Sequence, residues 1–239
     1  MTEQTGGENT TSDNSKGGNL TVPMAIIAAG ALVAGAIFIT QSSTSVDKNV
    51  AKVPAEENSS ITVRPVDDTD HIRGNPNAEI VIIEYSDTEC PWCREFHKSM
   101  KELMETDGKS GRIAWVYRHF PVHQQSAREI EALECATELG GNEGFWNYLD
   151  RLFEITPAND QFDLAKLPEI ADYAGLDTAA FDACLQSGRY AGVPAADKKE
   201  AIEAGAEGTP YNIVISSSGR HIIPGYLPYN NLKAQLEEF

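Results

Sequence analysis

The most reactive motif in the sequence is a pair of cysteines, Cys90 and Cys93, with Pro91 and Trp92 between them. A helix is predicted to begin here, and Pro91 suits its first turn because a missing N–H costs nothing there. Cys90 would then face unpaired backbone N–H groups and the positive end of the helix dipole, which stabilise a thiolate, the nucleophilic form of cysteine. Cys93 lies one turn further on, where it can resolve a mixed disulfide. Cys90 is therefore expected to be the exposed thiol with the low pKa, and Cys93 is expected to be buried behind it. The spacing predicts thiol–disulfide exchange.

Other uses of this pair remain open at the level of sequence. The two cysteines could be two of the four ligands of a zinc site. His97 could supply a third ligand, while no fourth is evident. The remaining cysteines, Cys135 and Cys184, lie in separate helical stripes without a neighbouring histidine. His97, His119 and His123 are scattered and are expected to be structural. We therefore expect no metal site, and we disfavour a plain structural disulfide because an exposed strand-to-helix turn is typical of reactive thiols.

A second feature is the tripeptide Gly208-Thr209-Pro210, which precedes a predicted strand. A proline in this setting is a candidate for a cis peptide bond. An ordinary trans turn is the alternative, and the tripeptide alone does not decide between the two. It becomes specific only in combination with the cysteine motif and the order of elements described below.

Glu84 is a lone carboxylate in an apolar run, six residues before Cys90. Burial of such a group is costly unless it is protonated or used. The functional interpretation is a proton acceptor for Cys93, with a pKa raised by burial. A partly exposed carboxylate at the end of a strand is the alternative. We favour the acid–base role because of the position beside the cysteine motif.

The elements that must position these residues follow from hydrophobic patterning. They are a strand over residues 79–86, a helix over about 91–106, a strand over 112–120 and a helical block over about 126–206, followed by a strand, a Ser-Gly turn, a strand and a final helix. The first two strands are parallel if the helix between them is a right-handed crossover. Within the block, Gly140-Gly141 is predicted to end the first helix. Pro194 is predicted to lie near the start of the last one or at a kink.

The sequence resembles the DsbA-like thiol–disulfide oxidoreductases of the thioredoxin superfamily. The segments that carry the resemblance are DHIRGNPNAEIVIIEYSDTECPWC, YRHFPVH, ALECA followed by FW, AGLDTAAFDACLQSGRY, the GTP before YNIVI, and the terminal PYNNLKAQL. They cover residues 70–239 almost without gaps. The resemblance implies an α/β thioredoxin fold with a helical domain inserted at about residues 122–188, in agreement with the order of elements above.

The resemblance also implies a set of site residues. These are catalytic Cys90, Cys93, Glu84 and Pro210, and substrate-binding Pro91, Trp92 and Thr209. Cys90 would be the nucleophile, Cys93 the resolving thiol and Pro210 a cis-proline beside them. The backbone of Thr209 would pair with the substrate chain, and apolar surface around Trp92 should be exposed to grip an unfolded protein. No cofactor is expected beyond the redox-active disulfide.

Cys135 and Cys184 are predicted to form a structural disulfide within the helical insert. Each lies in the apolar stripe of its own helix, so both would point into one small core. The resembled family often has cysteines at both places. Two buried free thiols that pack as small hydrophobic side chains are the alternative.

The dipeptide between the active-site cysteines differs from the Pro-His of the best-known oxidases in the family. Trp92 does not supply the N–H and partial charge that a histidine gives to the thiolate. Glu89 adds an opposing negative charge, weakly if it is exposed. Both differences predict a less depressed pKa for Cys90 and a less oxidising disulfide.

The chain is expected to consist of a disordered tail (1–21), a transmembrane anchor (22–40), a flexible tether (41–67) and the folded domain (68–239). Residues 22–39 are apolar or small throughout, which is just long enough to span a hydrocarbon core. A cleaved signal peptide is the alternative. It is disfavoured because the preceding region is mostly acidic and the following residues make a poor cleavage site.

A single-pass location in the cell membrane is expected, with the catalytic domain on the extracytoplasmic side. Lys48 and Lys52 after the apolar segment, against Lys16 before it, mildly favour the reverse orientation. We still expect the domain outside, because a cytosolic pool would keep the thiols reduced and the resembled family works in exported compartments.

The net charge of −17 argues against nucleic acid and anionic lipid surfaces as partners. The leading hypothesis is a membrane-tethered dithiol oxidase that exchanges the Cys90–Cys93 disulfide with cysteines of unfolded or reduced exported proteins. A quinone-linked membrane protein, DsbB-like or VKOR-like, would reoxidise the pair. The alternatives are a disulfide reductase or isomerase with the same residues and, in a different class, a metal-delivery protein that binds through the CxxC motif.

Overall fold

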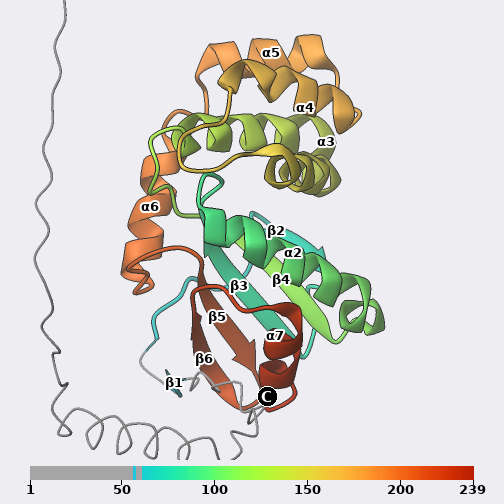
Figure 1. Ribbon diagram of the computed structural model, residues 1–239, viewed down its shortest axis with the longest axis vertical. Helices are drawn as coiled ribbons and strands as arrows, with labels where there is room; N and C mark the ends of the chain where they lie inside the picture. The colour runs from blue at the N-terminus through green and yellow to red at the C-terminus, as the bar shows by residue number, and fades with distance from the viewer. Residues whose placement is uncertain (1–55, 58–60) are drawn as a thin grey trace, which may run out of the picture. The chain divides into compact units, whose positions relative to one another are not determined.

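The computed structural model describes residues 56, 57 and 61–239 of the chain. Within this part, a six-stranded sheet has the order β1-β6-β5-β3-β4-β2 (Figure 1). The strands are β1 (Glu56–Glu57), β2 (His71–Gly74), β3 (Ile80–Ser86), β4 (Ile113–His119), β5 (Tyr211–Ser216) and β6 (Gly219–Pro224). The helices are α2 (Pro91–Glu105), α3 (Ser126–Ile155), α4 (Leu167–Tyr173), α5 (Thr178–Ser187), α6 (Val193–Glu203) and α7 (Tyr229–Leu236), with 3-10 turns η1 (Asp107–Ser110) and η2 (Leu164–Lys166). β3 and β4 are parallel, and the other neighbouring strands pair antiparallel.

The central strands β3 and β4 are apolar on both faces. In β3 every residue except Val81 is buried, and all of β4 is buried. A strand that is covered on both faces has a continuous apolar run instead of an alternating pattern. Both strands match their predicted ranges. The edge strand β2 has no counterpart among the predicted strands, because four residues of mixed polarity carry no recognisable period.

Different helices cover the two faces of the sheet. On one face α2 and α7 lie side by side, and α6 packs against β4 on the other (Figure 1). α2 buries Phe96, Met100 and Leu103 at helical spacing in the same core as Ile82 of β3. The next residue, Ile83, belongs to the core on the opposite face. The sheet therefore separates two hydrophobic cores.

The helical insert consists of α3, α4 and α5, which pack on one another. Gly141 has φ 60° and ψ −155° inside α3, so the helix is interrupted where the sequence predicts a break and then continues. The predicted disulfide between Cys135 of α3 and Cys184 of α5 is confirmed, with Cα atoms 5.9 Å apart. Pro194 lies in the first turn of α6, which decides between the two predicted placements.

The prediction of a flexible tether over residues 41–67 is wrong for the part that the structure describes. β1 pairs with β6, and Ile61 and Val63 are each only 7% exposed within a hydrophobic core. Arg64 forms ion pairs that reach α6. Two alternating apolar residues are too short a pattern to be distinguished from a linker, and only tertiary contacts bury them. The folded domain therefore begins before the predicted Asp68.

Among the described residues, no helix combines the length and hydrophobicity that crossing a bilayer requires. The predicted disordered tail (1–21), the transmembrane anchor (22–40) and the first part of the tether lie outside the described residues. The inserted helical domain falls close to its predicted range of about 122–188.

Candidate active site

The cysteine motif lies at the junction of β3 and α2. Cys90 is the residue immediately before the helix, with an extended backbone (φ −81°, ψ 122°), and Pro91 is in the first turn. The backbone N–H of Asp87 points to the sulfur of Cys93 at 3.4 Å. The strand and the helix thus place both sulfurs at one tight turn, as the sequence predicts.

Both cysteines are free thiols, and both are buried. Cys93 has no exposed surface and Cys90 is only 5% exposed, whereas the sequence predicts an exposed Cys90. The loop before β5 accounts for this difference, because the backbone carbonyl of Thr209 lies 3.5 Å from the Cys90 sulfur. Cys90 is nonetheless the more accessible of the two.

The two thiols have opposite electrostatic environments. The pKa of Cys90 is lowered to about 6, chiefly by a hydrogen bond from the Cys93 thiol, with Thr209 and the backbone N–H groups of Cys93 and Trp92 acting in the same direction and partial burial opposing them. Complete burial raises the pKa of Cys93 well above its ordinary value, and the adjacent Cys90 acts in the same direction. At neutral pH Cys90 is therefore a thiolate and Cys93 a thiol.

The Thr209–Pro210 peptide bond is cis, as predicted, and it lies against the cysteine pair. The carbonyl of Pro210 accepts a 2.9 Å hydrogen bond from the N–H of Gly225, at the end of β6. This bond anchors the loop to the sheet. An edge of the Thr209 backbone is thereby held beside the reactive sulfur.

Glu84 is fully buried in β3, and burial raises its pKa to about 8. One of its carboxyl oxygens accepts a hydrogen bond from the indole of Trp115. Its charge also acts on the Cys93 thiol and raises the pKa of that group. At neutral pH Glu84 is therefore mostly protonated and close to the Cys93 thiol, which is the arrangement that an acid–base role requires.

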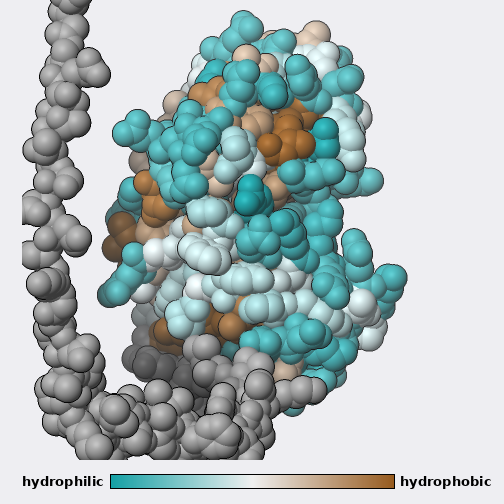
Figure 2. Space-filling view, in the orientation of Figure 1, coloured by the Kyte–Doolittle hydropathy of each residue, from teal (hydrophilic) through white to brown (hydrophobic). Residues whose placement is uncertain are grey.

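Apolar surface is exposed next to the motif. Trp92 is 60% exposed, and its ring stacks on Tyr226 with centroids 6.0 Å apart. Val122 is also exposed, and its backbone N–H is bound by the side chain of Asp87, which begins the active-site turn. The face of the domain in Figure 2 is mostly hydrophilic, with hydrophobic patches over the helical insert, beside α6 and near the lower end of the sheet. Tyr226 is a site residue that sequence reasoning missed, since it lies in a loop without any pattern.

Glu89 is completely buried, so the condition of exposure under which its charge would act only weakly is not met. Its carboxylate accepts hydrogen bonds from the Thr156 hydroxyl and the Gln161 N–H, both at 3.3 Å. Glu129 of α3 is buried nearby, and its pKa is raised to about 9 by burial and by Glu89. Its position on the buried stripe of α3, three residues before Ala132, is the signal that could have revealed it.

His97, the possible third zinc ligand, is engaged elsewhere. Its Nε2 lies 2.8 Å from Asp150, and its ring contacts Trp115 and Phe153. Burial lowers the pKa of His97, which favours the neutral ring. These contacts give the side chain a structural role between α2 and α3.

Several solved structures share this fold. BdbD from Bacillus subtilis superimposes with a TM-score of 0.65 at 18% identity, covering 76% of this chain and 98% of that one. Wolbachia pipientis alpha-DsbA1 superimposes with a TM-score of 0.61 at 22% identity, covering 73% of this chain and 92% of that one. Pseudomonas aeruginosa DsbA2 superimposes with a TM-score of 0.57 at 22% identity, covering 74% of this chain and 96% of that one. The thioredoxin fold with a helical insert is therefore shared with DsbA-type proteins.

Curated relatives match only over a part of their own length. The Na(+)/H(+) antiporter NhaA 3 of Salinispora tropica is 35% identical over 170 residues, which is 70% of this chain and 24% of that protein. NhaA 1 of Mycobacterium sp. (strain KMS) is 34% identical over 121 residues, 50% of this chain and 19% of that protein. The chain thus spans about a quarter or less of these relatives. The name antiporter therefore belongs to those longer proteins and is not transferred to this chain.

A family model described as Thioredoxin matches residues 66–237, from just before β2 to the end of α7. The match includes the cysteine motif, the buried Glu84 and the cis-proline loop. On the fold, the site geometry and this match, the chain belongs to the thioredoxin family.

Proposed function

We propose that the chain is a thiol–disulfide oxidoreductase that exchanges the Cys90–Cys93 disulfide with cysteines of exported proteins and acts as a dithiol oxidase. The observation that carries this proposal is the asymmetry of the pair at one helix start. Cys90 has a low pKa and borders the Thr209 carbonyl, while Cys93 is buried with a high pKa. A stable thiolate at Cys90 makes it a good leaving group and therefore favours transfer of the disulfide to a substrate.

The reaction follows from these positions. A substrate thiolate attacks the sulfur of Cys90 in the disulfide form, the bond to Cys93 breaks, and Cys93 leaves and takes up a proton. Glu84, protonated near neutral pH, is placed to supply that proton. A second substrate thiolate then attacks the substrate sulfur of the mixed disulfide, and Cys90 leaves as a thiolate. The substrate gains a disulfide, and the cysteine pair is left reduced.

The same surface explains how an extended polypeptide would be held. The backbone edge at Thr209 can pair with a substrate strand, as in β-augmentation. The exposed ring of Trp92, the adjoining Pro91 and the exposed Val122 supply apolar contact without demanding a particular side chain. Unfolded proteins of varied sequence are the substrate class that such a surface suits.

We further propose that residues 22–40 anchor the protein in the cell membrane with the catalytic domain on the extracytoplasmic side. The apolar run of residues 22–39 and the low thiol pKa of Cys90 support this placement. A quinone-linked membrane protein, DsbB-like or VKOR-like, would accept the two electrons from the reduced pair.

A reductase or isomerase is the second candidate. It is favoured by Trp92 in place of a histidine and by the buried negative charge of Glu89 close to the motif. Both features would make the disulfide less oxidising. The metal-delivery alternative has less support, because His97 is bound to Asp150.

The reduction potential of the Cys90–Cys93 pair, measured against glutathione, decides between these functions. A value above roughly −200 mV supports the oxidase, whereas a value near about −270 mV is that of a reductase. In cells, the Cys93→Ser variant should accumulate mixed disulfides with exported proteins, while the matched Cys90→Ser variant should not. Equal trapping by the two variants would contradict the assignment of Cys90 as the nucleophile.

A further inference from the structure

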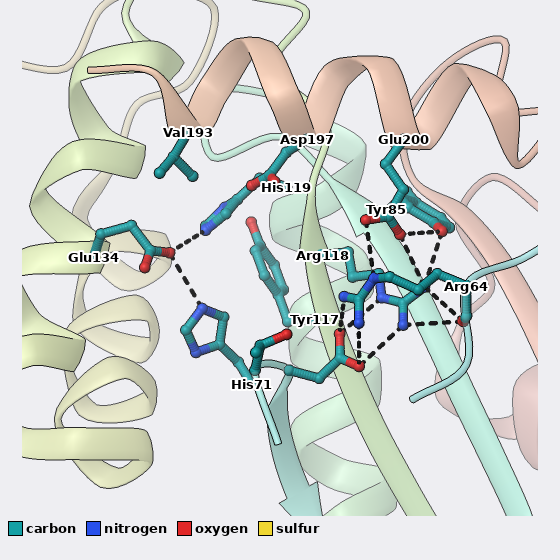
Figure 3. Close-up of a pocket in the computed structure, with 12 residues that line it drawn as sticks. Arg64, His71, Tyr85, Tyr117, Arg118, His119, Glu134, Val193, Asp197 and Glu200 are labelled. Atoms are coloured by element: carbon teal, nitrogen blue, oxygen red, sulfur yellow. Dashed lines mark hydrogen bonds and ion pairs between the residues drawn. The ribbon is translucent and has the colours of Figure 1, made fainter. Parts of the chain in front are cut away.

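Two histidines and a glutamate from three separate elements meet where β4 ends, beside α3. His71 comes from β2, His119 ends β4, and Glu134 belongs to α3. The Nε2 atoms of both rings face the same carboxylate oxygen of Glu134, at 3.3 Å from His71 and 3.2 Å from His119 (Figure 3). All three atoms lie within 4.8 Å of one another.

We propose that His71, His119 and Glu134 bind a divalent transition-metal ion, with Zn²⁺ as the ion that the ligand set favours. Two imidazoles and one carboxylate form a protein ligand set that zinc uses, with the fourth position left to water or another group. In a tetrahedron with bonds of about 2.0–2.1 Å, neighbouring ligand atoms are about 3.4 Å apart. The two separations from the Glu134 oxygen match that edge, as two histidines and a carboxylate on one ion require.

The ligands are already held in place by packing. The His71 ring is stacked on Phe145, with centroids 3.5 Å apart and planes at 2°. The His119 ring meets the edges of Phe145 and Tyr117. The side chain of His119 is 3% exposed and that of Glu134 is 17% exposed. Such preorganisation lowers the entropic cost of binding an ion.

The cavity in front of these ligands has room for an ion with its water. Its volume is about 210 Å³, and one water molecule takes about 30 Å³. The two arginines in the wall, Arg64 and Arg118, form ion pairs with Asp70 and Glu200 (Figure 3). Their positive charges are thereby offset inside the wall itself.

Two carboxylates of the cavity lack such a cation. Among the described residues, no lysine or arginine forms an ion pair with Glu134 or with Asp197, which faces His119 from α6 (Figure 3). The Nδ1 of His119 is buried, and it has no hydrogen-bond partner in the described part of the chain. Metal-binding histidines usually donate their second N–H to a carboxylate. Asp197 is available for that hydrogen bond or as a fourth ligand.

The site has a structural consequence for the domain. It joins the edge strand β2, the central strand β4 and the insert helix α3. His119 also pairs in register with Ser86 of β3, four residues before Cys90. An ion bound here would therefore stabilise the junction between the sheet and the helical insert behind the active-site turn.

The test uses the full-length chain in its oxidised form, because the disulfide removes the Cys90 and Cys93 thiolates as competing ligands. Co²⁺ is titrated and followed by visible absorption, and Zn²⁺ affinity is measured by competition. We expect one ion per chain, with a tetrahedral Co²⁺ spectrum that lacks thiolate charge-transfer bands. His71→Gln, His119→Gln and Glu134→Gln should each weaken Zn²⁺ binding by about a hundredfold or more.

The matched control is His221→Gln, which removes a largely buried histidine from β6 at the other end of the sheet. It should bind Zn²⁺ as the natural chain does. Zn²⁺ should also raise the thermal midpoint of the natural chain and of the control, but not of the ligand variants. If His119→Gln does not fold by circular dichroism, the two remaining ligand variants decide.

Three results would overturn the proposal. The first is the absence of a tetrahedral Co²⁺ spectrum in the oxidised chain. The second is Zn²⁺ affinity that does not change in the ligand variants. The third is a preference for Ca²⁺ over Zn²⁺, because calcium selects oxygen ligands and would have to be bound elsewhere.

Discussion

The indole N–H of Trp115 in β4 donates a 2.9 Å hydrogen bond to the Oε2 of Glu84 in β3, and neither side chain is exposed to solvent. The two strands are parallel neighbours, so this bond spans the centre of the sheet. It holds one oxygen of the carboxyl group, and the Ser86 hydroxyl also interacts with that group. Glu84 is thus fixed in orientation within the buried strand.

Replacing Glu84 by glutamine should change how stability depends on pH. The pKa of Glu84 is raised from 4.5 to about 8 in the folded chain, so between these values the folded state holds a proton that the unfolded state has lost. The free energy of unfolding therefore falls as the pH rises through this window, by about 1.4 kcal/mol per pH unit for one proton. Urea denaturation from pH 5 to 8 should show a shallower fall for Glu84→Gln.

The control for that experiment is Glu79→Gln, since the side chain of Glu79 is 78% exposed. It should leave the pH dependence as in the natural chain. Identical slopes for Glu84→Gln and the natural chain would show that Glu84 is not a protonated buried group.

The Cys90 thiol should titrate near pH 6 in the reduced chain, because the hydrogen bond from Cys93 is the largest of the effects that lower its pKa. Alkylation followed against pH, with mapping of the modified residue, measures this value. Cys93→Ala removes the hydrogen bond and should move the titration of Cys90 to higher pH. Preferential labelling of Cys93 at mildly acidic pH is the result that this assignment does not allow.

Trp92→Ala should weaken substrate binding without lowering stability. The ring is 60% exposed and its main aromatic contact is the stack on Tyr226, so its removal opens no core cavity. We expect KM for a reduced, unfolded protein to rise several-fold with kcat changed less. Tyr173→Ala, which removes a ring that is 64% exposed on the helical insert, is the control and should not change KM. An equal rise for both variants would mean that the surface around Trp92 has no special role.

The Cys135–Cys184 disulfide should stabilise the insert without taking part in the exchange reaction. It joins residues 49 positions apart, and closing a loop of that length is worth roughly 4 kcal/mol on the chain-entropy model. The double variant Cys135→Ala/Cys184→Ala should therefore unfold at clearly lower urea concentration while Cys90 and Cys93 still exchange disulfides. A double variant as stable as the natural chain, compared under the same oxidising conditions, would refute this role.

Asp70→Asn should be strongly destabilising. Asp70 pairs with Arg118 at 2.8 Å, and both side chains are at most 5% exposed. Without Asp70, Arg118 keeps its ion pair with the partly exposed Glu200 but loses its buried partner, and breaking a buried pair costs about 3 kcal/mol. Asp67→Asn, which breaks an exposed ion pair with Arg64, is the matched control and should lower stability much less, because solvent screens that pair. Chemical denaturation of the two variants distinguishes a buried network from a surface one.

The sequence by itself determined the features that depend on local pattern or on independent motifs. The run at residues 79–86 can only be a strand covered on both faces, and Pro91 starts the helix that follows it. The cysteine motif at that junction and the Gly-Thr-Pro before β5 together identify the thioredoxin arrangement. Cys135 and Cys184 lie on the apolar faces of their helices, and their bond followed from the family resemblance.

Only the tertiary structure decided the features in which distant segments bury a side chain or bring charges together. Ile61 and Val63 were predicted to lie in a linker, but they belong to a hydrophobic core with residues of β3, β4 and β5. The burial of Glu89, which the sequence left open, is decided by contacts with Thr156 and Gln161. No sequence pattern connects His71, His119 and Glu134, because the elements that carry them, β2, β4 and α3, meet only in the folded chain. Periodicity reports which face of one element is buried, whereas these contacts depend on the distances between elements, and those distances are set by the packing of the whole domain.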